Sequence, residues 1–121
     1  MRLSLVMVLL MACGSPEDLS FERDVQPMLF TQCGACHLGA DAEAGLDLVT
    51  NPYAAVVDVP SGQAPYLLVQ PGSGIESYLW HKLNGTQVLA EGAGASMPLG
   101  RALGGEELDL VFDWIEEGAA P

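Results

Sequence analysis

The chain has 121 residues, enough for one domain with a modest core. Its formal charge is −12 and it has only 4 basic residues, which argues against a nucleic-acid partner because phosphate binding needs a basic stripe. So acidic a surface favours solubility, or a partner protein with a basic surface.

The N-terminal residues 1–12 are typical of a short secretory signal peptide. Arg2 supplies the positive charge, and the apolar run that follows is too short to span a bilayer, which takes roughly 20 apolar residues. Residues 10–13, Leu-Met-Ala-Cys, resemble a bacterial lipobox, which implies cleavage before Cys13 and attachment of lipid to its sulfur. The alternative is ordinary cleavage after Gly14, which would release a soluble periplasmic protein.

Residues 13–19 are then expected to be a lipidated cysteine with a short polar tether, and residues 20–121 a single domain. The tether would hold the domain near the membrane without strong orientation. The expected location is the periplasmic side of a bacterial cell envelope. Gly14 stands where the lipoprotein pattern has an aspartate for inner-membrane retention, which favours the outer membrane.

The domain is predicted to be mainly α-helical, and its first helix is expected over residues 20–32. Asp24 is a plausible N-cap, and Pro27 would then fall in the first turn, where its missing N–H costs little. Asn51-Pro52 is typical of the start of a short helix that runs to about residue 57. Apolar residues 56–59 and 66–69 could pair as a short hairpin, although the two prolines between them weaken this prediction.

Two further helices are expected in the second half of the chain. Residues 73–76 resemble a capping box for a helix to about residue 83, with Ile75 on its apolar side and Gly85 just after its end. Apolar residues at helical spacing predict the last helix over residues 105–117. Glu116 and Glu117 fall at its C-terminal end, where the helix dipole disfavours acids, and the sequence offers no reason beyond solubility.

The motif that organises the chain is Cys33-Gly34-Ala35-Cys36-His37, the C-x-x-C-H attachment signature of a c-type haem. Two thiols at this spacing can bond the two vinyl groups on one porphyrin edge, and the following histidine then lies under the iron as its proximal ligand. A thioredoxin-like redox pair would need a βαβ context. A zinc site would need a second ligand pair, for which only Cys13 and His81 remain.

The sixth iron ligand is expected to be Met97. It lies in a glycine-rich loop directly before Pro98, whereas Met28 falls on the apolar face of the first helix and is most simply a core residue. His81 is the competing ligand, and a place near a haem propionate is a further possibility for it, together with Trp80 or Lys82.

A His/Met ligand pair raises the reduction potential relative to two histidines. Apolar packing by residues such as Leu46, Leu48 and Leu99 would raise it further, because a low dielectric disfavours the more charged ferric iron. A positive potential is therefore expected.

The residues before Cys33, Asp24-Val25-Gln26-Pro27-Met28-Leu29, resemble the first helix of a class I c-type cytochrome domain. With the Met-Pro loop and Asp113-Trp114-Ile115 near the end, the chain is similar to the planctomycete-type cytochrome C family over nearly its whole length after the tether. The resemblance implies a small helical domain wrapped around one covalently attached haem c. It also implies that Cys33 and Cys36 form the thioethers, and that His37 and Met97 are the proximal and distal ligands.

The expected function is one-electron transfer by a membrane-anchored carrier, as a monomer or as a subunit of a redox complex, with no catalytic residues of its own. Its partner would be another redox protein. One alternative is a haem sensor that binds a small ligand because its sixth ligand is labile or absent. Another is a redox subunit docked permanently to a larger enzyme.

Overall fold

The computed structural model describes residues 17–121, so the predicted signal peptide and Cys13 lie outside the described residues. Regular structure in this part of the chain is helical, and β-pairing is limited there to isolated bridges, which confirms the predicted helical class. None of the helices between residues 17 and 121 combines the length and apolar character needed to cross a membrane. In chain order the elements are η1 (Phe21–Val25), α1 (Gln26–Cys33), η2 (Gly39–Asp41), η3 (Glu43–Gly45), α2 (Pro52–Val56), α3 (Tyr78–Asn84) and α4 (Gly105–Glu116).

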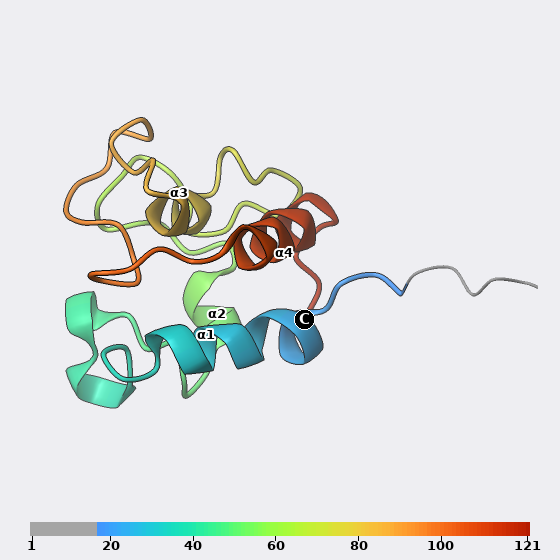
Figure 1. Ribbon diagram of the computed structural model, residues 1–121, viewed down its shortest axis with the longest axis horizontal. Coiled ribbons are helices and arrows are strands. Elements are labelled where there is room, and N and C mark those ends of the chain that lie inside the picture. Colours follow the sequence, from blue (N-terminus) through green and yellow to red (C-terminus); the bar gives the residue numbers. More distant parts are fainter. Residues whose placement is uncertain (1–16) are drawn as a thin grey trace, which may run out of the picture.

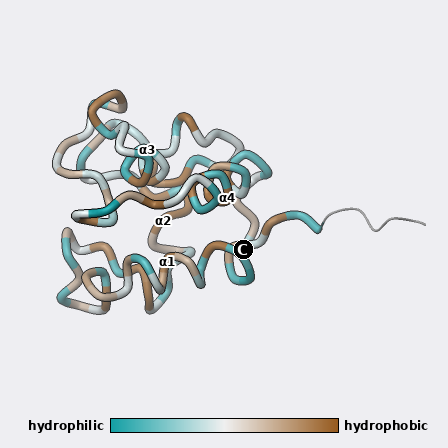
Figure 2. The backbone as a smooth tube through the Cα atoms, viewed as in Figure 1, coloured by the Kyte–Doolittle hydropathy of each residue, from teal (hydrophilic) through white to brown (hydrophobic). Residues whose placement is uncertain are grey.

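The elements form two layers, as Figure 1 shows. η1, α1 and the short turns η2 and η3 make the lower layer, α3 and α4 make the upper layer, and α2 lies between them in this view. Side chains from both layers make one core, whose fully buried members include Val25 and Leu29 from below and Val111, Trp114 and Ile115 from α4. Figure 2 shows hydrophobic residues in the middle of the molecule, and also at loop tips outside it.

The first helix begins with η1 at Phe21, inside the predicted range, but its N-cap is Ser20 and not, as predicted, Asp24. Ser20 Oγ accepts a hydrogen bond from Arg23 N at 3.2 Å, and Asp24 Oδ2 accepts one from Ser20 N at 2.8 Å. The two side chains therefore cap the same end reciprocally. The first turn is a wide π-type turn, and Pro27, which has no N–H to donate, stands at the start of α1.

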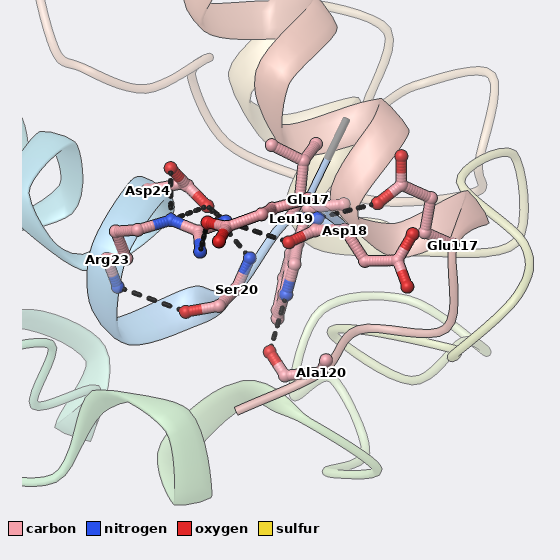
Figure 3. Close-up of polar contacts among 9 residues, drawn as sticks. Glu17, Asp18, Leu19, Ser20, Arg23, Asp24, Glu117 and Ala120 are labelled. Carbon is pink, nitrogen blue, oxygen red and sulfur yellow. Dashed lines mark hydrogen bonds and ion pairs between the residues drawn. The ribbon is translucent and has the colours of Figure 1, made fainter. Parts of the chain in front are cut away.

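Residues 17–19, at the end of the expected tether, are fastened to the domain (Figure 3). Arg23 contacts Glu17 Oε2 at 3.1 Å and donates to the carbonyl of Asp18 at 2.7 Å. Leu19 N donates to Glu117 Oε2 at 2.9 Å. Glu117 therefore holds the incoming chain, a role that its position at a helix end did not suggest.

The middle of the chain keeps the predicted helix at α2 but not a hairpin of two strands. Pro60 and Leu67 form a single antiparallel bridge, and Leu68 N donates to the carbonyl of Val59 at 2.7 Å. Pro60 and Pro65 have no N–H to extend this ladder, which explains why it stays so short.

α3 begins later than the capping-box pattern predicts. Ser73 Oγ does accept from Glu76 N at 3.3 Å, but helical geometry starts only at Tyr78. Ser77, fully buried, donates from its hydroxyl to the carbonyl of Ser73 at 2.7 Å and so replaces the first helical turn with a side-chain bond. Ile75 precedes the helix and is 62% exposed, so its predicted place on the apolar face is wrong.

The end of the chain ties the layers together. Ala120 accepts hydrogen bonds from Phe21 N at 2.9 Å and from Trp114 Nε1 at 2.8 Å. Tyr53 on α2 donates to the carbonyl of Ala119 at 2.9 Å. One short segment thus contacts η1, α2 and α4.

Candidate functional site

The C-x-x-C-H motif follows directly from α1, whose last residue is Cys33. Gly34 continues the turn by donating to the carbonyl of Phe30 at 3.1 Å, and a Cβ on this glycine would lie 2.6 Å from that oxygen. Cys36 N and His37 N both donate to the carbonyl of Cys33, at 3.3 and 3.1 Å. The helix end and one compact turn therefore present both thiols and the imidazole together.

The two thiols have different surroundings. Both are free, but Cys33 is buried and Cys36 is exposed. Burial raises the pKa of the Cys33 thiol, and the positive charge of Arg101 opposes this rise.

His37 is held by the backbone of residues 46–48. Its Nδ1 lies 3.0 Å from the carbonyl oxygen of Leu46, and its own carbonyl accepts from Leu48 N at 2.9 Å. A carbonyl can only accept, so Nδ1 carries a hydrogen, and in the neutral ring Nε2 then keeps its lone pair. This is the arrangement in which a histidine is oriented to bind a metal through Nε2.

Asp47 fixes the segment that orients His37, a role that the sequence reasoning missed. Its Oδ1 accepts from Val49 N at 2.9 Å and from Thr50 N at 3.0 Å. These bonds, with the Thr50 side chain contributing most, hold the pKa of the Asp47 carboxyl well below its usual range. The signal was an aspartate that could form an Asx turn with the residues just after it.

Met97 packs against the core of the domain, to which Cys33 also belongs. It is half-buried and packs against the cluster that contains Cys33, Leu48 and Leu103. Its backbone N donates to the carbonyl of Lys82 on α3 at 2.9 Å. In Figure 1 the loop before α4 and the segment with η2 and η3 lie at the same end of the molecule, on opposite layers.

The apolar surroundings differ in part from those expected. Leu48 is buried and Leu46 half-buried, as expected, and both belong to or pack against the cluster with Met97. Leu99 is 73% exposed, so its predicted place in the apolar packing is wrong.

His81 uses both ring nitrogens within the protein. Nε2 lies 2.7 Å from the carbonyl of Ile75, and Nδ1 lies 2.7 Å from Thr86 Oγ1. It is buried and bridges the residues on either side of α3. In this arrangement His81 offers no free nitrogen to an iron.

Trp80 on α3 has a buried indole N–H that finds no acceptor among residues 17–121. Its ring meets Phe112 edge-on, with centroids 5.0 Å apart, and it packs against the cluster with Met97. Such a donor is costly to bury alone, by about 1–3 kcal/mol.

Among the described residues, no three histidine, cysteine or acidic side chains converge as a metal-binding group. A haem iron would not require such a group, because the porphyrin supplies four of its ligands.

No protein-family model matches the sequence, and no curated protein matches it. The fold is similar to part of a hydrazine synthase chain from Kuenenia stuttgartiensis, with a TM-score of 0.54 and 24% sequence identity. The match covers 84% of this chain but only 16% of that chain. The likeness therefore establishes a shared helical fold.

Proposed function

We propose that this protein is a one-electron carrier with one covalently attached haem c. Cys33 and Cys36 would form the thioethers, His37 would be the proximal ligand and Met97 the distal ligand. The observation that carries the proposal is the His37 ring, which the Leu46 carbonyl orients at 3.0 Å beside two free thiols.

The residues present fit such a group in their chemistry. His37 has a free Nε2, Met97 has a thioether that packs against the core to which Cys33 belongs, and Trp80 has a buried N–H without an acceptor in the described part of the chain. A haem carries two carboxylates, which are acceptors of the kind that this donor lacks. When bound, the haem would supply an iron that cycles between ferric and ferrous states.

The protein's own contribution would be ligation and burial. Buried Leu48 and half-buried Leu46 would help to exclude water from a bound haem, which would disfavour the more charged ferric iron. With a His/Met pair, this favours a positive reduction potential. The charge of −12 favours a redox partner with a basic surface, so the association rate should fall as salt is added.

One observation favours a second candidate, a redox subunit of a larger enzyme. The fold match covers only 16% of the larger hydrazine synthase chain, so a similar fold occurs there as a part of a bigger protein. Elution as a free monomer after extraction with detergent would count against this reading.

The test is an optical spectrum of the exported protein, produced with haem c maturation machinery, with Met97→Leu and Met28→Leu as matched variants. A carrier should give a sharp low-spin reduced spectrum, and a weak iron–methionine band when oxidised that is lost only in Met97→Leu. A high-spin spectrum that responds to carbon monoxide would instead indicate a sensor. Absence of covalent haem would overturn both functions.

We also propose that the protein is anchored by lipid on Cys13, on the periplasmic side of the outer membrane. Cys13 and the lipobox lie outside the described residues, so the support is the sequence alone. Metabolic labelling with palmitate should mark the wild type but not Cys13→Ala. If neither the wild type nor Cys13→Ala is labelled and the protein is found in the periplasmic fraction, ordinary signal cleavage is favoured.

A further inference from the structure

One residue of α3, Lys82, contacts both ends of the short segment that leads to Met97. Its carbonyl accepts from Met97 N at 2.9 Å, and its Nζ donates to the carbonyl of Ala93 at 2.8 Å. Residues 93–97 are therefore spanned by the main chain and the side chain of a single helical residue. A loop rich in glycine would otherwise have little to fix it.

Lys82 Nζ works together with two other polar side chains. Gln63 Oε1 accepts from Lys82 Nζ at 2.8 Å and from the Tyr78 hydroxyl at 3.2 Å. The Tyr78 hydroxyl also lies 3.3 Å from the Ala93 carbonyl, so its single hydrogen goes to one or the other of these two oxygens. We call Gln63, Tyr78 and Lys82 the polar clasp.

The segment passes the clasp at very close range. A Cβ on Gly92 would lie 2.3 Å from the Tyr78 hydroxyl oxygen, and one on Gly94 would lie 3.2 Å from Lys82 Nζ. Gln87, which is 8% exposed, donates from Nε2 to the carbonyl of Gly94 at 3.1 Å. Gly92 and Gly94 thus allow the segment to come this close to α3, and hydrogen bonds from Lys82 and Gln87 then hold the segment in place.

Lys82 is half-buried. Burial lowers the pKa of its ammonium group. Its Nζ makes no ion pair with a described carboxylate, although the chain is strongly acidic. The ammonium group of Lys82 instead donates to Gln63 Oε1 and to the Ala93 carbonyl, and so it holds the loop that carries Met97.

We infer that the polar clasp positions Met97, with Lys82 as the positioning residue that keeps this methionine at the sixth ligand position. The inference rests on the proposed role of Met97. It adds a control point, because whatever loosens the clasp would open the sixth position to an external ligand.

The test is a titration of the oxidised holoprotein with imidazole, followed by loss of the iron–methionine band. Lys82→Met keeps the aliphatic stem but removes the donors, so Met97 should be displaced more easily. We expect imidazole to bind about tenfold more tightly, which is about 1.4 kcal/mol. Lys82→Arg, which restores donors, should recover part of the change, and Gln63→Ala should weaken the clasp without disturbing a buried side chain.

Arg23→Met is the charge control, because it removes one positive charge at the end of the molecule where residues 17–19 enter, and its contacts there are with Glu17, Asp18 and Asp24. Its imidazole affinity should stay within twofold of wild type. Equal affinities for wild type and Lys82→Met would overturn the positioning role and leave the proposed function intact.

Amide hydrogen exchange gives a readout that does not depend on the iron. Exchange of residues 93–97 should accelerate in Lys82→Met, while exchange in α4 stays as in wild type. Unchanged exchange in this segment would contradict the clasp itself. A wild type without an iron–methionine band would instead refute the proposed ligand.

Discussion

The orientation of His37 depends on a neighbour that contributes only its backbone. The Leu46 carbonyl binds Nδ1, and the Asp47 carboxylate keeps the next turn in place through Val49 N and Thr50 N. Asp47, which makes no hydrogen bond to the imidazole itself, therefore helps to determine how well the His37 ring is preorganised.

We expect the stabilising effect of Asp47 to depend on pH. Folding lowers the pKa of this carboxyl, so the unfolded chain binds its proton more readily than the native protein does. The contribution to the free energy of unfolding is complete above the usual value of 3.8 and is lost as pH falls through the lowered pKa.

Urea unfolding of wild type and Asp47→Asn from pH 6 to pH 3 measures this. The difference in the free energy of unfolding between them should be largest at pH 6 and should shrink towards pH 3. Asp109→Asn, on an exposed face of α4, is the control, and the dependence on pH should be larger for Asp47→Asn than for Asp109→Asn. A difference between wild type and Asp47→Asn that grows on acidification would contradict the assignment.

The sequence singles out the candidate residues of this site but not the groups that support them. The spacing of Cys33, Cys36 and His37 carries the chemistry in itself, and Met97 was singled out by its loop. The Leu46 carbonyl could not be predicted, because every residue has one. Lys82 and Gln63 are 19 positions apart, and only the fold brings them together.

At the scale of elements, α4 was predicted well because its apolar spacing is regular. Its acidic end was not understood, and the contacts explain it: Glu116 Oε1 accepts from Gly74 N at 2.9 Å, and Glu117 accepts from Leu19 N. The capping-box pattern predicted too early a start for α3. In the structure, hydrogen bonds of the buried Ser77 hydroxyl with Gln70 N and with the Ser73 carbonyl take the place of the first turn.

Gly74 is where the loop before α3 meets α4 most closely. A Cβ there would lie 2.4 Å from Phe112 Cε2, and the Phe112 ring is itself backed by Trp80. We expect Gly74→Ala to lower the free energy of unfolding by about 1–3 kcal/mol, as overpacking does.

Gly62→Ala provides the comparison for this substitution. A Cβ at Gly62 meets nothing within 4 Å, so the same chemical change should be nearly neutral. Urea denaturation of the two variants would distinguish local overpacking from a general effect of replacing glycine. Equal losses would show that the approach of Gly74 to Phe112 is not tight.

At the scale of the whole molecule, the chain enters and leaves at one end, while the C-x-x-C-H motif and the Met97 loop lie at the other end in Figure 1. Arg23 and Glu117 hold residues 17–19 at the entry end. If Cys13 carries the anchor, the proposed haem site lies at the end of the domain away from the point of attachment, which suits a partner that approaches from the water phase.

The two tryptophans test how the layers are joined. Trp114 is fully buried, stacks beside Phe21 with centroids 5.3 Å apart and donates to the Ala120 carbonyl. Trp80 is half-buried, and its N–H finds no acceptor in the described part of the chain. Changing each to phenylalanine makes the same chemical change in two different settings.

Trp114→Phe should lower the free energy of unfolding by about 2–4 kcal/mol, because it removes buried contacts and leaves the Ala120 carbonyl one donor short. Trp80→Phe should cost clearly less, since it also removes an unpaired buried donor. Urea unfolding of both variants in the same form of the protein measures the contrast. If the two losses are equal in haem-loaded protein but unequal in haem-free protein, the bound group gives the Trp80 N–H its acceptor. Equal losses in both forms would contradict the finding that the Trp80 N–H has no acceptor within residues 17–121.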